Sequence, residues 1–171
     1  MKGYQRRMPS FPDLPERMIT GSLEPVQEFE PDEKLYRRCS SDMVIEGYLA
    51  PPSVTTQPQG IDFPEMSVNR GNFSEPNDVC LAISRTDSDW DRWGIAQFIV
   101  SDVPEQYNGT LIPQQSEWAW RLFHNPDPEN YAHSEVRSYG DGNFATPPKL
   151  VRKWFRTALH FKAKVIKDPQ K

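Results

Sequence analysis

Proline occurs throughout this chain and limits how long any regular element can run. Seventeen of the 171 residues are proline, and a proline inside a helix or a central strand removes a backbone donor. Five of them interrupt the first 32 residues: Pro9, Pro12, Pro15, Pro25 and Pro31. The same segment carries several acids. We therefore interpret residues 1–32 as a Pro-rich acidic arm, followed by a single domain over residues 33–171.

Short runs rich in β-branched and aromatic residues predict the strands of this domain. The clearest run covers residues 93–100 and has the composition of a central strand. Further strand-like runs lie at residues 35–39, 43–49, 63–69, 118–123, 132–139 and 161–166. Since the runs are short and separated by turn residues, they favour a sheet rather than a helical bundle.

Two helices are expected beside the strands. Apolar residues recur between Leu150 and Leu159 at helical spacing, which predicts an amphipathic helix over residues 148–160. Ser74 and Pro76 are typical of a helix start, so a shorter helix is expected near residues 75–83. The expected fold class is α+β. It comprises a mixed or antiparallel sheet of about five strands, packed by the C-terminal amphipathic helix and the shorter helix, with an irregular N-terminal arm.

Cysteine use and hydropathy indicate the compartment. Cys39 and Cys80 are the only cysteines, and we predict that both are buried thiols rather than a disulfide. The sequence has no run of about 18 apolar residues and no apolar segment behind its basic start. We expect a protein without membrane contact in the cytoplasm of a prokaryote or of a virus-infected prokaryotic cell. No Cys-x-x-Cys or close histidine pair is present, so we expect no metal and no cofactor.

The arm carries four apolar residues that fit a docking segment: Phe11, Leu14, Met18 and Ile19. Such segments order when they bind a partner. The alternative is that the arm is a surface wrap or a flexible leader. Because the sequence combines this arm with a basic tail and has no catalytic motif, the leading functional hypothesis is an intracellular interaction protein. It would be a small accessory subunit that docks to a protein partner.

The C-terminal tract is strongly basic. Residues 149–171 hold eight Lys or Arg against one acid, a charge of +7, so residues 1–148 carry −11 of the total of −4. Three interpretations remain open: a nucleic-acid contact, a pairing with the acidic arm, and a soluble helix face. The nucleic-acid hypothesis uses four residues of the predicted helix, namely Lys149, Arg152, Lys153 and Arg156.

Residues 118–137 hold two of the three histidines around a stiff, Pro- and Asn-containing turn. His124 precedes the turn, and His133 and Glu135 follow it. In a strand, His133 and Glu135 share one face, so the carboxylate could orient an imidazole that acts as a general base. The alternative is a satisfied polar patch.

Arg37 or Arg38, Ser67 and Glu135 stand in three strand-like segments, in that order. This order resembles the arginine–serine–glutamate layout of ADP-ribosyltransferases. The resemblance implies that the arginine holds the NAD phosphate or ribose, the serine props the site, and the glutamate stabilises the oxocarbenium-like transition state. In this chain Met66 and Val68 flank Ser67, where the family has Ser-Thr-Ser. His133 stands where the family usually has Glu or Gln.

Short pieces across residues 34–166 also resemble a group of small uncharacterised bacterial proteins, which implies no activity. They include Leu-Tyr-Arg-Arg at residues 35–38 and Met-Ser-Val-Asn at residues 66–69. The alternative functions are therefore an NAD- or nucleotide-processing enzyme using Arg37 or Arg38, Ser67, His133 and Glu135, and a nucleic-acid-binding module.

Overall fold

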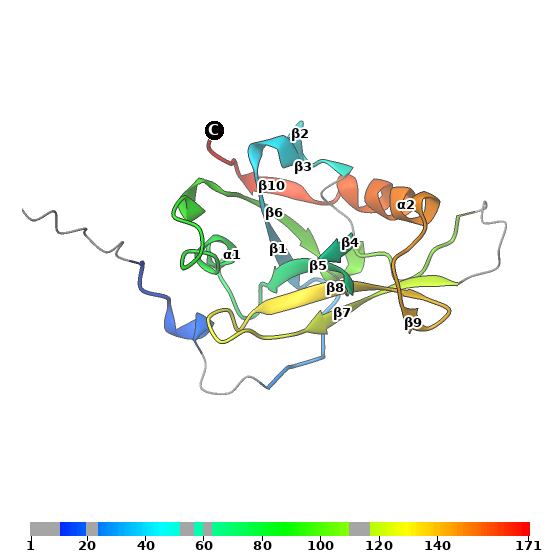
Figure 1. Cartoon of the computed structure of the whole chain (residues 1–171), viewed down its shortest axis with the longest axis horizontal. Helices are drawn as coiled ribbons and strands as arrows, with labels where there is room; N and C mark the ends of the chain where they lie inside the picture. The colour runs from blue at the N-terminus through cyan, green and yellow to red at the C-terminus, as the bar shows by residue number, and fades with distance from the viewer. Residues whose placement is uncertain (1–10, 20–23, 52–56, 60–62, 110–116) are drawn as a thin grey trace, which may run out of the picture.

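The computed structural model describes residues 11–19, 24–51, 57–59, 63–109 and 117–171. These residues fold mainly into one antiparallel sheet (Figure 1). Its ten strands are β1 (Lys34–Cys39), β2 (Val44–Ile45), β3 (Tyr48–Leu49), β4 (Gln57–Gln59), β5 (Phe63–Arg70), β6 (Gly94–Ile99), β7 (Trp118–His124), β8 (His133–Gly140), β9 (Asn143–Phe144) and β10 (Lys164–Lys167). The α-helices of the described chain are α1 (Asp78–Leu81) and α2 (Lys149–His160).

The expected α+β class with about five strands is therefore wrong, because the protein is mostly sheet. Helix α1 is only a single turn of four residues. The segment at residues 43–49, expected as one strand, folds into the hairpin β2–β3. Glu46 and Gly47 have positive φ angles of 52° and 82°, and such pairs form the two-residue turns that match the twist of a hairpin.

The main path of the sheet runs in the order β2-β3-β10-β6-β1-β5-β8-β7. The strongest predicted strand is β6, and it lies between β10 and β1. All six residues of β1 pair with β6, and five residues of β5 pair with β8. Strands β4 and β9 extend the sheet beside β5 and β8.

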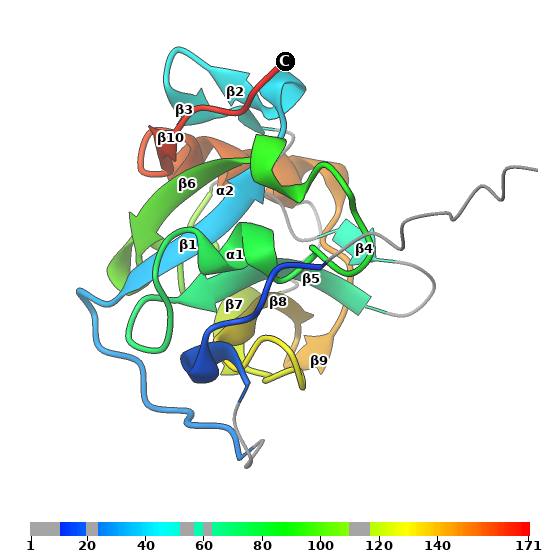
Figure 2. The same cartoon turned by 90° about the vertical axis from the view of Figure 1, so that its left-hand side faces the viewer.

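The two faces of the sheet are covered differently, because alternate residues of a strand point to opposite faces. On one face, Val151, Phe155 and Leu159 of α2 join the large buried cluster, and the ring of Phe155 stacks 4.6 Å from that of Trp120. On the other face, a smaller cluster forms around Val79 of α1. Figure 2 shows α1 and α2 on opposite sides of the sheet.

Part of the arm packs on the domain rather than lying outside it. A 3-10 turn at Glu16–Met18 buries Met18 to 1% exposure. Arg17 makes a two-atom ion pair with the buried carboxylate of Asp78, at 2.6 and 2.8 Å. The backbone N–H of Tyr131 donates to the Met18 carbonyl at 3.1 Å. These contacts tie the described part of the arm to α1 and to the segment before β8.

Cys39 and Cys80 are both buried and unpaired with each other, as predicted. No helix in the described ranges is long and apolar enough to cross a membrane.

Candidate active site

Polar side chains collect on the sheet face that carries α1. Strand pairing sets Ser67 opposite Glu135 and Asn69 opposite His133. Directly paired residues of neighbouring strands point to the same face. His133 and Glu135 therefore lie on one face together with the serine, as their spacing predicts.

A break between β1 and β5 opens this face. The two strands pair only at Leu35–Arg70 and Tyr36–Asn69 within the described residues. Beyond these pairs, the Arg37 side chain donates to the Ser67 carbonyl at 2.9 Å. The Arg37 guanidinium therefore links the two strands where backbone hydrogen bonds between them are missing. Burial, and then the neighbouring charge of Arg38, lowers the pKa of Arg37 to about 10. Arg37 is thus a structural bridge across the gap.

A hollow of about 590 Å³ lies over the gap, and a smaller one of about 200 Å³ adjoins it. Both are lined by Arg38, Ser67, Ala82, Asn130 and His133. The cleft thus brings together a predicted arginine, the predicted serine and the predicted histidine, which come from β1, β5 and β8. Its rim on the loop before β8 carries Asp127 and Glu129.

Arg38 supplies the free cation of this cleft. Its guanidinium lies 5.5 Å from the centre of the Trp93 ring, and no described residue forms a hydrogen bond or ion pair with it. Burial lowers the pKa of Arg38, but a guanidinium remains charged at neutral pH. Its donors are therefore available for an anion, whereas those of Arg37 are partly used in the sheet.

His133 is held in one tautomer. Its Nδ1 lies 2.7 Å from the Asn125 carbonyl and 3.6 Å from a carboxylate oxygen of Asp127. A carbonyl only accepts, so Nδ1 must carry the proton. The neutral ring then has Nε2 as an acceptor, and no described residue occupies it. This arrangement is typical of a histidine that can take up a proton.

Glu135 lies behind this histidine and is only 4% exposed. Asn125 donates to one carboxylate oxygen at 2.8 Å, and Arg137 contacts the other at 2.7 and 2.5 Å. Burial acts to raise the pKa of Glu135, but these hydrogen bonds outweigh it and hold the pKa below its usual value. Glu135 is not among the described residues that line the cleft. It fixes Asn125, whose carbonyl in turn fixes His133.

Glu65, which sequence reasoning missed, completes this cluster. It precedes Ser67 by two residues and shares its face of β5. Burial, the charge of Glu135 and a hydrogen bond to that carboxylate raise the pKa of Glu65. The pattern that could have revealed it is the alternation of Glu65, Ser67 and Asn69 along one strand.

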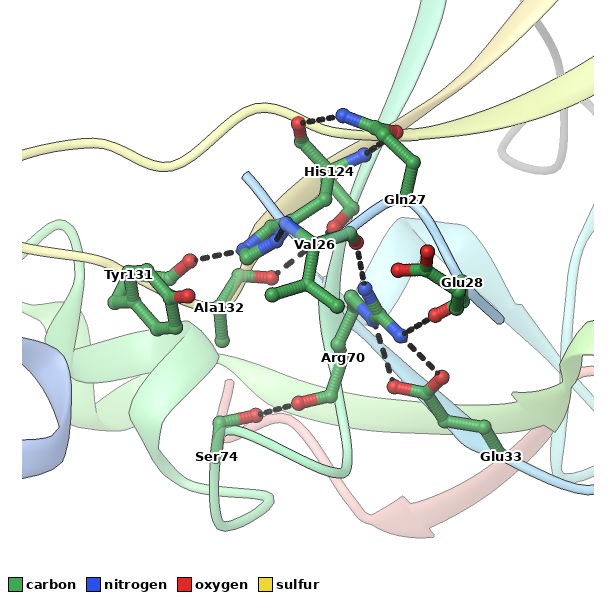
Figure 3. Close-up of polar contacts among 10 residues, drawn as sticks. Val26, Gln27, Glu28, Glu33, Arg70, Ser74, His124, Tyr131 and Ala132 are labelled. Carbon is green, nitrogen blue, oxygen red and sulfur yellow. Dashed lines mark hydrogen bonds and ion pairs between the residues drawn. The ribbon is translucent and has the colours of Figure 1, made fainter. Parts of the chain in front are cut away.

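His124 does not share the cleft, because it pairs with Ser134 on the opposite face. Val26 N–H donates to its Nδ1 at 2.9 Å, and its Nε2 donates to the Tyr131 carbonyl at 2.6 Å (Figure 3). Burial lowers the pKa of His124 against the opposing effect of these hydrogen bonds. The ring is therefore a neutral structural link between the arm and the sheet.

Arg70 is the other missed polar residue, and Figure 3 shows it at the centre of the arm contact. It is 1% exposed and pairs with Glu33 through two contacts of 2.8 Å. It also donates to the carbonyls of Val26 and Glu28. It directly follows the predicted run at residues 63–69, and no local pattern signals its burial.

The predicted partner-binding residues of the arm differ in exposure. Phe11 and Ile19 are 47% and 49% exposed, Leu14 is half-buried, and Met18 is buried in the protein's own fold. On α2, Lys149 and Lys153 are exposed and Arg152 and Arg156 are half-buried. Among the described residues, no cluster of three or more His, Cys, Asp or Glu could hold a metal ion.

Comparison with known proteins assigns this chain to no family. No protein-family model matches the chain, and neither a curated protein nor a solved structure matches it.

Proposed function

We propose that this chain is an enzyme that acts on NAD or a related nucleotide, bound in the cleft between β1 and β8. One observation carries the proposal. The unpaired guanidinium of Arg38 lines the same cleft as Ser67 and as His133. A guanidinium matches the geometry of phosphate oxygens, and a tautomer-fixed histidine suits proton transfer.

The chemistry assigns a role to each group. Arg38 binds the diphosphate, and the Ser67 hydroxyl contacts the ribose. The bond between ribose C1′ and the nicotinamide nitrogen breaks, and the nicotinamide leaves with the electron pair. A hydroxyl oxygen of water or of an acceptor bonds to C1′, and its proton passes to Nε2 of His133. Glu135 acts as a positioning residue through Asn125.

The test measures binding and turnover separately on the full chain. ADP-ribose binding is followed by calorimetry, and nicotinamide release from NAD is followed by NMR. Arg38→Gln loses a charge-assisted contact of about 1.5–3 kcal/mol and should bind roughly 10- to 100-fold more weakly. His133→Ala should keep binding but lose about 100-fold or more in turnover.

Arg92→Gln is the matched control, because the Arg92 side chain is exposed and its one ion pair within the described residues is a distant one with Asp89 at 3.9 Å. It should leave both measurements unchanged. The proposal fails if the wild-type protein binds neither ADP-ribose nor NAD. It also fails if Arg38→Gln binds as tightly as Arg92→Gln.

The exposure of Phe11 and Ile19 favours a second candidate, docking of a protein partner through the arm. In affinity capture from the host, Phe11→Asp combined with Ile19→Asp should abolish retention of a stoichiometric partner. Ile45→Asp is the control, because Ile45 is 51% exposed on β2, away from the arm. Equal capture by both variants would exclude this role for the arm.

A further inference from the structure

The charged residues of α2 form one continuous basic face. Lys149, Arg152, Lys153 and Arg156 fall within about 100° of one another around a helix of 3.6 residues per turn. His160 extends this face by one more turn, and the helix contains no acid. The buried residues Val151, Phe155 and Leu159 centre about 110° from the basic residues. Lys149 and Lys153 therefore point to solvent, whereas Arg152 and Arg156 lie at the border with the core and are half-buried.

This charge has no partner in the described part of the chain. None of the ion pairs there involves a cation of α2. Arg152 and Arg156 lie one turn apart, where like charges repel. Burial, and then the charge of Arg152, lowers the pKa of Arg156. The buried Nε atoms of both arginines lack an acceptor among the described residues. An anion bound to the accessible guanidinium nitrogens would relieve the repulsion between the two charges.

An exposed aromatic ring lies at the C-terminal end of the helix, beside His160. Phe161 follows the helix directly and is 69% exposed, the largest value among the exposed apolar side chains of the described residues. Its ring lies 4.5 Å from His160 and 6.3 Å from Tyr48. Lys162 and Lys164 follow it in sequence. Cations that lead to an exposed aromatic ring are typical of single-strand nucleic-acid surfaces, where bases stack and the backbone follows the charge.

The basic face is separate from the cleft. The apolar face of α2 packs on the side of the sheet opposite α1 (Figure 2), whereas the cleft is lined by Ala82 just after α1. A ligand on α2 therefore does not compete with a nucleotide in the cleft.

We propose that α2 and Phe161 form a binding surface for single-stranded nucleic acid. The cations of α2 contact backbone phosphates, and Phe161 stacks on a base. The guanidinium forks of Arg152 and Arg156 match phosphate oxygens. The exposed ring favours a nucleic acid over an acidic protein, which offers no base to stack. This inference does not depend on the proposed enzymatic activity.

The test uses a short fluorescein-labelled oligo-dT, the full chain and fluorescence anisotropy over a salt series. Four phosphate contacts predict a slope of log K against log salt of roughly −3. Arg152→Ala combined with Arg156→Ala should weaken binding and reduce that slope to roughly half. Phe161→Ala should weaken binding about five- to a hundred-fold.

Three controls keep the result interpretable. Lys34→Ala with Arg92→Ala removes the same charge from exposed positions outside α2 and should leave the slope unchanged. Arg152→Lys with Arg156→Lys keeps the charge and should keep most of the slope. A duplex and polyglutamate should both compete poorly.

The proposal is overturned if binding is insensitive to salt or if the two alanine pairs behave alike. Equal competition by polyglutamate would identify an acidic-protein surface instead. Equal competition by the duplex, with no effect of Phe161→Ala, would exclude the stacking step.

Discussion

Replacing Arg70 by methionine tests what holds the arm on the sheet. Its guanidinium is buried between the Glu33 carboxylate and the carbonyls of Val26 and Glu28. Its charge also lies 3.9 Å from the centre of the Phe29 ring. Methionine fills much of the same volume but supplies no donor. The substitution thus leaves a fully buried carboxylate without a partner.

The expected loss follows from that orphaned charge. Removing one member of a buried ion pair costs about 3–5 kcal/mol, whereas replacing both members by apolar residues is often neutral. The double substitution Arg70→Met with Glu33→Leu still leaves two carbonyls without their donor, which costs about 1–3 kcal/mol. The single variant should therefore lose at least about 3 kcal/mol of unfolding free energy, and the double variant should be more stable than the single one.

Urea unfolding followed by tryptophan fluorescence measures both variants, with Arg92→Met as the exposed control. Arg92 pairs with Asp89 at 3.9 Å in solvent, and such pairs contribute less than about 1 kcal/mol. A loss below about 1 kcal/mol for Arg70→Met would refute the reasoning. So would a double variant that is less stable than the single one.

Three further predictions concern buried groups. Because burial lowers the pKa of His124, the folded state binds fewer protons. Stability should be full above the ordinary pKa of about 6.5 and fall as the pH drops below it. His124→Gln should remove that part of the pH dependence in urea titrations, and an unchanged profile would contradict the assignment. Burial raises the pKa of Cys39 to about 11 and also raises that of Cys80, so neither thiol should react with a disulfide reagent at pH 8 until the chain is unfolded. Rapid labelling of the native protein would contradict this. Asp78→Asn should weaken the hold on Arg17 and speed tryptic cleavage after that residue, and equal cleavage rates would show that the ion pair does not anchor the arm.

Local sequence patterns predicted the long elements but not the fold class. The stripe from Leu150 to Leu159 predicted α2 almost to its ends, because a 12-residue amphipathic helix repeats its period several times. Strands β2, β3 and β9 have two residues each, too few to show any alternation. They form in tight hairpins, β2 with β3 and β9 with β8, and β3 also pairs with the distant strand β10. The number of strands, and with it the fold class, could not be counted from local patterns.

The residues of the candidate site could also be predicted only in part, because local patterns do not show contacts between distant segments. Alternation correctly placed His133 and Glu135 on one face, but it could not say which of Arg37 and Arg38 points to that face. The choice depends on the register of β1 against β5, which sets Tyr36 opposite Asn69 and therefore puts Arg38 on that face. Arg70 and Glu33 are 37 residues apart, and nothing in either local sequence signals that they meet. Pairing between buried charges is visible only once the strands are placed.

The contacts that hold the arm on the sheet also hold the loop that positions His133 in the cleft. Residues 125–132 carry Asn125, whose carbonyl orients His133, and both ends of this loop are fixed. The arm holds one end, since Val26 donates to His124. Strand β5 holds the other, through two hydrogen bonds of 2.9 and 2.8 Å between Asn69 and Asn130. Because a loop clamped at both ends loses little further entropy when a ligand binds, the docked arm helps to preorganise the histidine of the cleft.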